Sequence, residues 1–390
     1  MKKIFSLFLT FIILFTSSVN AFAVEEAEEN QGYEITPADF TLEVGSAVLM
    51  EAETGTVLFS QNADVSAPPA SVTKVMTLLL VAEALEKEKI SLDEKVIISQ
   101  NAASMGGSQV FLKEGETMTV EELLKCTVIA SANDAALALA EKLYGNESAF
   151  VNAMNKRAAE LGMTGTSFEN VTGLDDTTKN HVSSAMDIAI MSRELIKHPV
   201  ILEYSSLWQD SIRNGEFTLT NTNRLVRYYD GCNGLKTGST DKAGFCISAT
   251  AKRDGMQLIA VIMGAKTRDE RNNAARALLD FGFSNYALYT EKEGVLEEVP
   301  VRCGVKDSTI LYSKPITKVV NRSDIKNINK VYEIPEFINA PTKADDAVGK
   351  IRYMIGDKLL TEADVVLKED IERATVWNLF IKALKSIVTG

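Results

Sequence analysis

The sequence has 390 residues, of which 46% are hydrophobic and 24% are charged, and its formal net charge is -12. This composition is that of a globular protein, and the length suggests two or three domains. The excess of acidic residues argues against nucleic acid as a partner. The four cysteines lack CxxC spacing and a histidine cluster, so we expect no metal site.

The N-terminus has the pattern of a secretory signal peptide. Lys2 and Lys3 precede a short apolar run, residues 4–15, and Ala21-Phe22-Ala23 follows as a small-residue cleavage site. An uncleaved anchor is the alternative, but the apolar run falls well below the roughly 20 residues that span a bilayer. We therefore predict export after cleavage behind residue 23, with 1–23 as signal peptide and 24–39 as a mobile leader, because this acidic stretch has no periodicity.

Residues 40–288 have the pattern of one α+β domain. β-prone runs on either side of Thr54-Gly55 and of Asp254-Gly255 predict two hairpins. Between them, apolar spacing and end signals predict mostly helices. The predicted features are a helix over 72–87 with Ser71 at its start, a capping box at 119–122, a break between helices at 131–134, and helices over 148–161, 184–196 and 268–281, the one over 184–196 closed by Pro199. Strands at both ends of a helical stretch imply that these strands share one sheet.

The last hundred residues differ from the preceding domain in their sequence pattern. Short β-branched runs separated by charged or proline-containing turns predict a small β-rich domain over 291–368. A helix over 370–390 places Trp377, Phe380, Ile381, Leu384 and Val388 on one stripe. Packing of this stripe on the β domain is one interpretation. We favour an amphipathic helix that associates with a membrane surface, because lysines lie away from the aromatic stripe.

The pairing state of the cysteines is open from sequence alone. Cys232 and Cys246 are candidates for a disulfide across neighbouring strands, outside the membrane. A chain of this length does not need such a cross-link, so four unpaired and mostly buried thiols are the favoured interpretation.

Ser71-Val72-Thr73-Lys74 is the first candidate site. Residues three apart share a helix face, so the Lys74 amine can reach the Ser71 hydroxyl and act as its base. Burial and a second cation, for which Lys236 is the candidate, would lower the pKa of Lys74. Backbone N–H groups at the helix start would stabilise a developing oxyanion. Taken alone, Ser71 is equally well a simple helix cap and Lys74 a surface residue.

Two further short motifs follow in order. Ser131-Ala132-Asn133 offers a hydroxyl for proton relay and an amide for a peptide bond, although both side chains are also ordinary caps at a helix break. Lys236-Thr237-Gly238 offers a cation and a hydroxyl for a carboxylate, and Gly238 would allow close approach of a substrate backbone. The alternative interpretation of residues 236–238 is an exposed turn that follows Asn233-Gly234. Each motif is weak alone, and their joint order in an exported chain is what points to one site.

The three ordered motifs resemble those of the serine-type D-alanyl-D-alanine carboxypeptidases of peptidase family S11, the low-molecular-weight penicillin-binding proteins. The resemblance covers essentially the whole mature chain. It includes residues 172–175, 181–185 and 267–271, while 291–368 resemble the β-rich C-terminal domain of the family. It implies an α+β fold of the penicillin-binding-protein and β-lactamase type. It also implies action on peptidoglycan stem peptides ending in D-Ala-D-Ala at the outer face of the cytoplasmic membrane or in the cell wall, without a cofactor or metal, and inhibition by β-lactam antibiotics.

The resemblance also implies a role for each matching residue. Ser71 would form the acyl-enzyme, Lys74 would be the base and Ser131 would shuttle protons. The implied substrate-binding residues are Asn133, Lys236, Thr237, Gly238, Ser239 and Lys266. The amides of Ser71 and Ser239 would form the oxyanion hole, and an exposed strand-end lysine is the alternative interpretation of Lys266.

Two positions depart from the family pattern, and three other functions compete. Val171-Thr172-Gly173 stands where Pro-His-Gly is common and Val182 where an aromatic residue is common, which we expect to affect substrate preference and not the three motifs.

A β-lactamase would need a carboxylate base, and Glu169 lacks the Glu-x-x-Leu-Asn spacing. A Ser-His-Asp hydrolase is disfavoured because the chain has only His181 and His198 and no GxSxG. A catalytically silent cell-wall binding protein is the third competitor.

Overall fold

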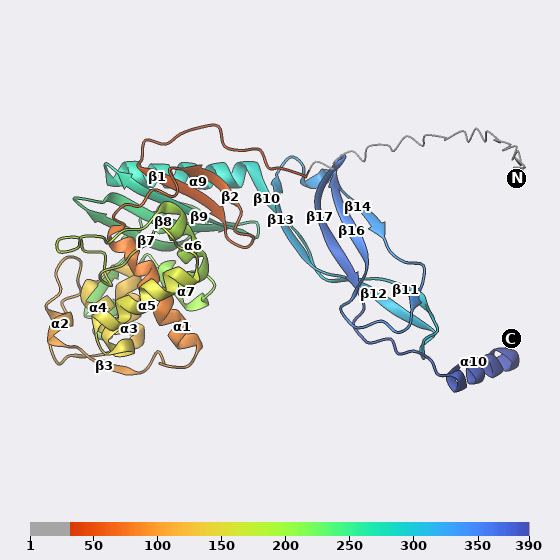
Figure 1. Ribbon diagram of the computed structural model, residues 1–390. Helices are drawn as coiled ribbons and strands as arrows, with labels where there is room; N and C mark the ends of the chain where they lie inside the picture. The colour runs from red at the N-terminus through yellow and green to blue at the C-terminus, as the bar shows by residue number, and fades with distance from the viewer. Residues whose placement is uncertain (1–31, 390) are drawn as a thin grey trace, which may run out of the picture.

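The computed structural model describes residues 32–389 and divides them into a large lobe, a slender β-rich lobe and a terminal helix (Figure 1). The predicted signal peptide and the first part of the predicted leader lie outside the described residues. The large lobe holds both α-helices and a sheet, whereas the second lobe is built from strands. The α+β class expected for the first domain and the β-rich character of the second are therefore confirmed.

A five-stranded antiparallel sheet is the centre of the large lobe. Its strand order is β2-β1-β9-β8-β7, so strands from both ends of the lobe's sequence share one sheet, as predicted. The bounds are β1 (Ser46–Glu51), β2 (Val57–Gln61), β7 (Cys232–Thr240), β8 (Gly244–Arg253) and β9 (Met256–Ala265). The predicted turn at Asp254-Gly255 joins β8 to β9. Strand β7 lies at the sheet edge, where one side of its backbone has no strand partner.

Helices cover both faces of this sheet. Helix α9 (Arg268–Asn285) lies along one face, where Leu225 also joins the core, and most of the other helices gather on the opposite face (Figure 1). The alternating residues of β9 explain this, because Leu258, Ala260 and Ile262 belong to the core under α9 while Ile259 and Val261 belong to the core under the helical group. The remaining helices are α1 (Lys74–Glu86), α2 (Gln100–Ala103), α3 (Val120–Ile129), α4 (Asn133–Tyr144), α5 (Glu147–Glu160), α6 (Ala185–Leu195), α7 (Pro199–Ser205) and α8 (Leu225–Tyr228).

Helix α1 is the central element of the helical group. Apolar residues surround it almost completely, and it is buried on nearly every side. The predicted helix over 72–87 begins differently, because Ala70–Thr73 forms a tighter 3₁₀ turn ahead of it. Ser71 therefore lies in that turn, three residues before the α-helix begins at Lys74.

Most of the predicted helix ends are confirmed, with two differences. The capping box forms between Thr119 and Glu122, and α3 and α4 are separated at residues 130–132. Pro199 does not simply close the helix before it, because it occupies the first turn of α7, where its missing N–H costs nothing. Helix α9 continues beyond the predicted residue 281 to Asn285.

The second lobe contains a six-stranded sheet in the order β14-β16-β17-β12-β11-β15 and a two-stranded ladder of β10 with β13. Its core includes Leu311, Tyr353 and Val365. The bounds are β10 (Tyr286–Glu291), β11 (Gly294–Arg302), β12 (Ser308–Ser313), β13 (Ile316–Asn321), β14 (Ile328–Glu333), β15 (Ile338–Asn339), β16 (Ala347–Ile355) and β17 (Lys358–Val366). Two short hairpins, β3 (Lys95–Ile97) with β4 (Thr117–Thr119) and β5 (Gln209–Ile212) with β6 (Phe217–Thr220), belong to the large lobe.

Residues 32–39 differ from the predicted mobile leader. The Tyr33 hydroxyl donates to Asp324 in the second lobe, and the Thr36 carbonyl accepts from the hydroxyl of Tyr286. Ile35 and Ala38 pack against the core beneath α9. This segment therefore has defined contacts to both lobes, which its acidic and aperiodic sequence did not reveal.

The cysteines are free thiols in the structure. Cys126, Cys232 and Cys246 are buried and Cys303 is exposed, and the Cys232 thiol instead contacts the carbonyl of Gly234. The favoured interpretation of mostly buried, unpaired thiols agrees with this arrangement. Residues 32–389 also contain no group of acidic, histidine and cysteine side chains arranged to hold a metal ion.

Candidate active site

The three motifs meet in one cavity of about 400 Å³ at the edge of the main sheet. Ser71 lies on its wall, together with Ser131 from the break between α3 and α4 and with residues 237–239 from β7. The rest of the lining is Ser108, Trp208, Thr220, Asn221, Thr222, Arg224, Arg268 and Arg271. Residues separated by up to 200 positions in the chain thus surround the proposed nucleophile.

The turn that carries Ser71 packs tightly on β7. A Cβ added to Gly238 would lie 2.6 Å from the Ser71 amide nitrogen and 2.9 Å from that of Val72. Glycine at 238 is therefore required so that the strand can approach the Ser71 turn. This differs from the expectation that Gly238 mainly makes room for the substrate backbone.

Lys74 is completely buried beside Ser71. Its Nζ lies 2.9 Å from Ser71 Oγ and donates to the Thr172 carbonyl, also at 2.9 Å. Burial, followed by the positive charge of Lys236, lowers the pKa of Lys74 well below its usual value, and the charge of Asp134 opposes this. The predicted causes, desolvation and a second cation, are both present.

Lys236 is the second buried cation. It is 1% exposed, and its Nζ donates to the Thr237 carbonyl at 2.8 Å. Burial and then the charge of Arg271 lower the pKa of Lys236 to about 7. Lys236 therefore changes its charge near neutral pH, where an ordinary lysine would stay protonated.

Ser131 and Asn133 are set by the helix break. Ser131 adopts the left-handed backbone conformation, with φ 62°, and is 3% exposed. For a residue with a side chain this conformation costs about 1–3 kcal/mol and is often found at functional sites. Asn133 donates through Nδ2 to the Gly106 carbonyl at 2.6 Å, while its buried Oδ1 has no hydrogen-bond partner among the described residues. The amide oxygen is therefore an available acceptor.

The loop 170–174 contacts the catalytic motif directly. Thr172 gives its carbonyl to Lys74, and Asn170 Oδ1 holds the loop by accepting from the amides of Thr172 and Gly173. A Cβ on Gly173 would fall 1.8 Å from the Ala70 carbonyl oxygen. We expected the unusual residues 171–173 not to affect the three motifs. That expectation is wrong, because the Thr172 carbonyl accepts from Lys74 and Gly173 packs against Ala70.

His181 supports the same motif from outside the cavity. Its Nδ1 accepts from the Glu169 amide at 3.0 Å, which leaves Nε2 as the donor to Thr73 Oγ1 at 2.7 Å. Burial lowers the pKa of His181 to about 4, so the ring is neutral. Glu169 is exposed and its two carboxylate oxygens accept from the amides of Lys179 and Asn180. Neither side chain is oriented by these bonds as the base for Ser71.

Lys266 is not part of this cavity. It is exposed at the end of β9, and the cavity is instead lined by Arg224, Arg268 and Arg271. Arg271 is 3% exposed, and its guanidinium donates to Asn272 Oδ1. Two arginines of α9, which begins at residue 268, line the cavity, two and five positions after Lys266.

Several other lining residues escaped the sequence interpretation. Thr222 accepts from the Thr237 hydroxyl at 2.9 Å, and Trp208 and Arg224 come from segments that carry no recognisable motif. Residues 267–271 had been noted only as a likeness to the family. A helix cap at Thr267 followed by two arginines in the first turns of the helix was the available signal for Arg268 and Arg271.

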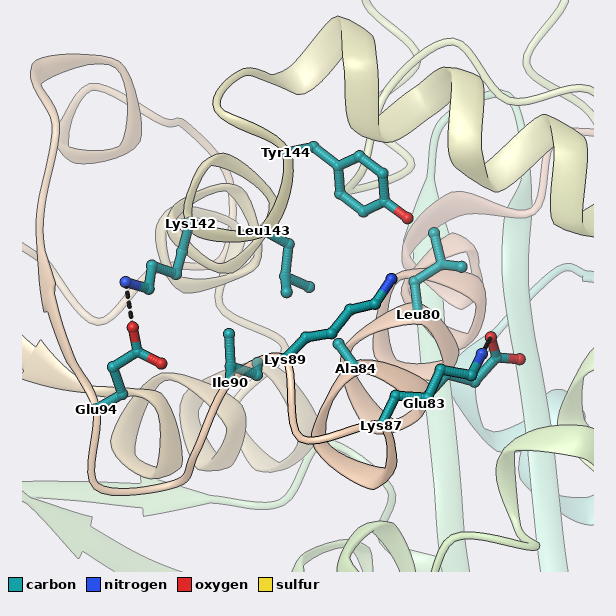
Figure 2. A pocket seen from close by; sticks show the side chains of 10 residues that line it. All are labelled: Leu80, Glu83, Ala84, Lys87, Lys89, Ile90, Glu94, Lys142, Leu143 and Tyr144. Atoms are coloured by element: carbon teal, nitrogen blue, oxygen red, sulfur yellow. Dashed lines mark hydrogen bonds and ion pairs between the residues drawn. The ribbon is translucent and has the colours of Figure 1, made fainter.

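A second cavity, of about 270 Å³, lies between α1 and α4, away from Ser71 (Figure 2). Figure 2 shows Lys142 paired with Glu94, at 2.5 Å, on one side. Lys87 pairs with Glu83 at 3.3 Å on the other side. Its lining contains no serine, threonine, cysteine or histidine. This cavity therefore offers no serine or cysteine nucleophile.

Comparison with known proteins gives two family matches along the chain. Residues 33–267 match the D-alanyl-D-alanine carboxypeptidase family of peptidase S11, and residues 283–373 match the C-terminal domain of penicillin-binding protein 5. The two matches correspond to the two lobes. The first contains all three motifs.

Relatives extend over nearly the whole sequence. The D-alanyl-D-alanine carboxypeptidase DacF of Bacillus subtilis is 40% identical over 381 residues, which cover 96% of each chain. The crystal structure of penicillin-binding protein 5 from Haemophilus influenzae has a TM-score of 0.75 at 29% identity and covers 87% of this chain and 100% of that one. Penicillin-binding protein D2 of Listeria monocytogenes, solved with ampicillin bound, has a TM-score of 0.58 at 34% identity and covers 63% of this chain and 99% of that one. The chain belongs to the serine-type D-alanyl-D-alanine carboxypeptidases, the low-molecular-weight penicillin-binding proteins of family S11.

Proposed function

We propose that this protein removes the terminal D-alanine from peptidoglycan stem peptides through an acyl-enzyme on Ser71. The observation that carries the proposal is the buried Lys74 amine 2.9 Å from Ser71 Oγ, beside a cavity that is also lined by arginines. The lowered pKa of Lys74 favours the neutral amine, and a neutral amine can accept a proton from the serine hydroxyl.

Acylation follows from these positions. The Ser71 hydroxyl gives its proton to Lys74 Nζ while Oγ attacks the carbonyl of the penultimate D-alanine. The amides of Ser71 and Ser239 stabilise the oxyanion. As the C–N bond breaks, a proton passes from Lys74 through the Ser131 hydroxyl to the leaving nitrogen. D-alanine departs, and the peptide remains as an ester on Ser71.

Substrate orientation is assigned to the two sides of the cavity. The free Oδ1 of Asn133 accepts an N–H from the acyl-side residue. On the other side, Thr237 and Arg271 hold the terminal carboxylate, and the buried Lys236, which donates to the Thr237 carbonyl, adds positive charge. Water then attacks the ester, with Lys74 again taking the proton, and no cofactor enters the scheme.

The competing β-lactamase function would need an efficient base for the deacylating water. The Glu169 oxygens are already engaged by backbone amides at 2.8 and 3.0 Å, which favours slow release of a penicilloyl group and hence inhibition by β-lactams. Measured turnover of penicillin at a rate comparable with that of the peptide would favour the β-lactamase instead.

The deciding experiment is release of D-alanine from a muramyl pentapeptide. We expect Ser71→Ala to abolish release and labelling by a fluorescent penicillin. Ser206→Ala, an exposed serine at the end of α7, is the matched control and should behave as wild type. Equal release of D-alanine by wild type and Ser71→Ala would overturn the proposal. Wild-type protein that releases no D-alanine would also overturn it and would favour a catalytically silent cell-wall binding protein.

We also propose that α10 (Val376–Thr389) attaches the exported protein to the outer face of the membrane. Trp377 and Phe380 stack on one another and are 69% and 52% exposed, beside other exposed apolar residues. Lys382 faces the protein, where it donates to the Gly304 carbonyl and pairs with Asp307. An apolar face open to solvent with its basic side held by the domain suits an interfacial helix. The described helices include none long and apolar enough to cross a bilayer.

Sedimentation with phospholipid vesicles tests this attachment. We expect the mature protein to sediment with vesicles of mixed zwitterionic and anionic lipid, and Trp377→Ser with Phe380→Ser to remain largely in the supernatant. Val331→Ser with Tyr332→Ser, an exposed apolar pair on β14, is the matched control. Undiminished sedimentation after deletion of residues 372–390 would contradict the proposal.

A further inference from the structure

The cavity beside Ser71 carries more positive charge than one substrate carboxylate needs. Arg224, Arg268 and Arg271 all line it, and no acidic residue does. Other arginines of the described chain, such as Arg157, Arg213 and Arg352, lie within 4 Å of a carboxylate. Across residues 32–389, none of the three cavity arginines has such a partner.

These like charges act on one another. Burial, then the charge of Arg268 and to a smaller degree that of Arg224, lowers the pKa of Arg271 to about 10. Unpaired cations held close together destabilise a protein unless an anion binds between them. The three arginines therefore form a candidate anion-binding site. Their combined positive charge exceeds that needed to neutralise one carboxylate.

The three arginines differ in their settings. Arg271 is buried next to Lys236, so it belongs with the groups that hold the terminal carboxylate. Arg224 and Arg268 are exposed at the rim, one preceding α8 and the other opening α9. Trp208 also lines the cavity and offers an apolar surface for the methylene groups of a side chain.

We propose that Arg224 and Arg268 form a second anion subsite, which accepts a carboxylate on the side chain of the leaving residue. The enzyme then hydrolyses peptides that end in an acidic D-amino acid, D-glutamate or D-aspartate, in preference to their neutral isosteres. The inference rests on the proposed carboxypeptidase function. The covalent step is unchanged: the C–N bond breaks, Ser71 gains the acyl group, and the acidic D-amino acid leaves with a proton on its nitrogen.

The test compares three diacetyl-L-lysyl-D-alanyl substrates that end in D-alanine, D-glutamate or D-glutamine. D-Glutamine matches D-glutamate in shape and lacks only the charge. We expect wild-type kcat/KM to be about tenfold higher for the D-glutamate peptide than for the D-glutamine peptide, because charge-assisted hydrogen bonds to arginine are the strong kind. The preference should weaken as salt is raised, since the rim is exposed.

Two variants identify the groups responsible. Arg224→Gln with Arg268→Gln should bring the D-glutamate to D-glutamine ratio close to one. Lys252→Gln, which removes an exposed cation at the end of β8, should keep the wild-type ratio. Labelling by a fluorescent penicillin verifies that each variant is folded and acylates.

The outcomes separate the two levels of the argument. Wild-type protein that releases D-alanine but shows a D-glutamate to D-glutamine ratio of one or less overturns the second subsite and leaves the carboxypeptidase intact. A double arginine variant that keeps the preference also overturns it. Protein that acts on none of the three peptides contradicts the carboxypeptidase itself.

Discussion

At the residue scale, the site depends on two lysines kept in an unusual state. Lys74 and Lys236 are both buried, and in each case burial is the main cause of the lowered pKa. The surroundings of Lys74 disfavour its charge, which suits a base. The pKa of Lys236 is lowered to about 7, so it carries charge below that pH, and its charge further lowers the pKa of Lys74.

The pH profile of kcat/KM for D-alanine release is the residue-scale prediction. Lys74 must be neutral, so the rate rises as pH increases through its pKa. Lys236 must be protonated to attract the carboxylate, so the rate falls above about pH 7, where Lys236 loses its proton. We expect a bell-shaped profile, followed by continuous assay of D-alanine.

Lys236→Arg distinguishes this assignment from other titrations. Arginine stays charged, so we expect a lower maximum rate but no fall above pH 7. Lys252→Arg at the exposed end of β8 should leave the profile unchanged. Persistence of the same descending limb in Lys236→Arg would assign that limb to another group.

At the element scale, the nucleophile is held by close backbone packing. The Ser71 turn is clamped between β7 at Gly238 and the loop at Gly173, and Ala70 within the turn has φ 48°. Such left-handed conformations of residues with side chains persist only where surrounding structure enforces them. The neighbouring elements therefore position Ser71 more than its own helix does.

Gly173→Ala tests this clamp. The new methyl group would meet the Ala70 carbonyl at 1.8 Å, and the backbone there has φ 84°. We expect a loss of at least about 2 kcal/mol in the free energy of unfolding and a strong loss of acylation by fluorescent penicillin. Chemical denaturation and labelling rate are the two measurements.

Gly162→Ala is the matched control for that prediction. It has a similar φ of 74°, but an added Cβ would have no atom within 4 Å. Only the backbone strain of about 1 kcal/mol should appear, with acylation unchanged. Equal effects of the two substitutions would show that strain alone, and not the contact with the Ser71 turn, explains the loss.

At the scale of the whole molecule, the second lobe contributes no residue to the cavity. The lining ends at Arg271, and the lobes meet where α9 passes into β10. Tyr286 and Val319 nevertheless belong to the core beneath α9, and Tyr33 reaches Asp324 across the junction. The second lobe thus supports the first without entering its chemistry.

Truncation after residue 291 tests this division. We expect the shortened protein to be acylated by fluorescent penicillin within about twofold of the full-length rate. Its thermal midpoint should fall by several degrees, because Val319 and the β13 partner of β10 are lost. A truncated protein with native circular dichroism but no acylation would contradict the division of roles.

The sequence alone predicted the features that depend on local order. The SxxK spacing determines that Lys74 can reach Ser71, because residues three apart share a helix face. The capping box at Thr119 and the turn at Asp254-Gly255 formed as predicted, since both depend on neighbouring residues. The ordered motifs likewise identified the family.

Only the tertiary structure decided which distant groups complete the site. Ser71 lies in a 3₁₀ turn held by Gly173 and Gly238, and Lys74 is oriented by a backbone carbonyl that any residue at 172 would supply. Arg271 lines the cavity, whereas Lys266, five positions earlier, lies outside it. Local sequence determines which residues share a face of one helix or strand. Which side chains of different elements come close together depends on the packing of the whole chain. For that reason the contact between Ser71 and Lys74, our proposed nucleophile and base, was predictable from sequence, and the carbonyl and arginines around them were not.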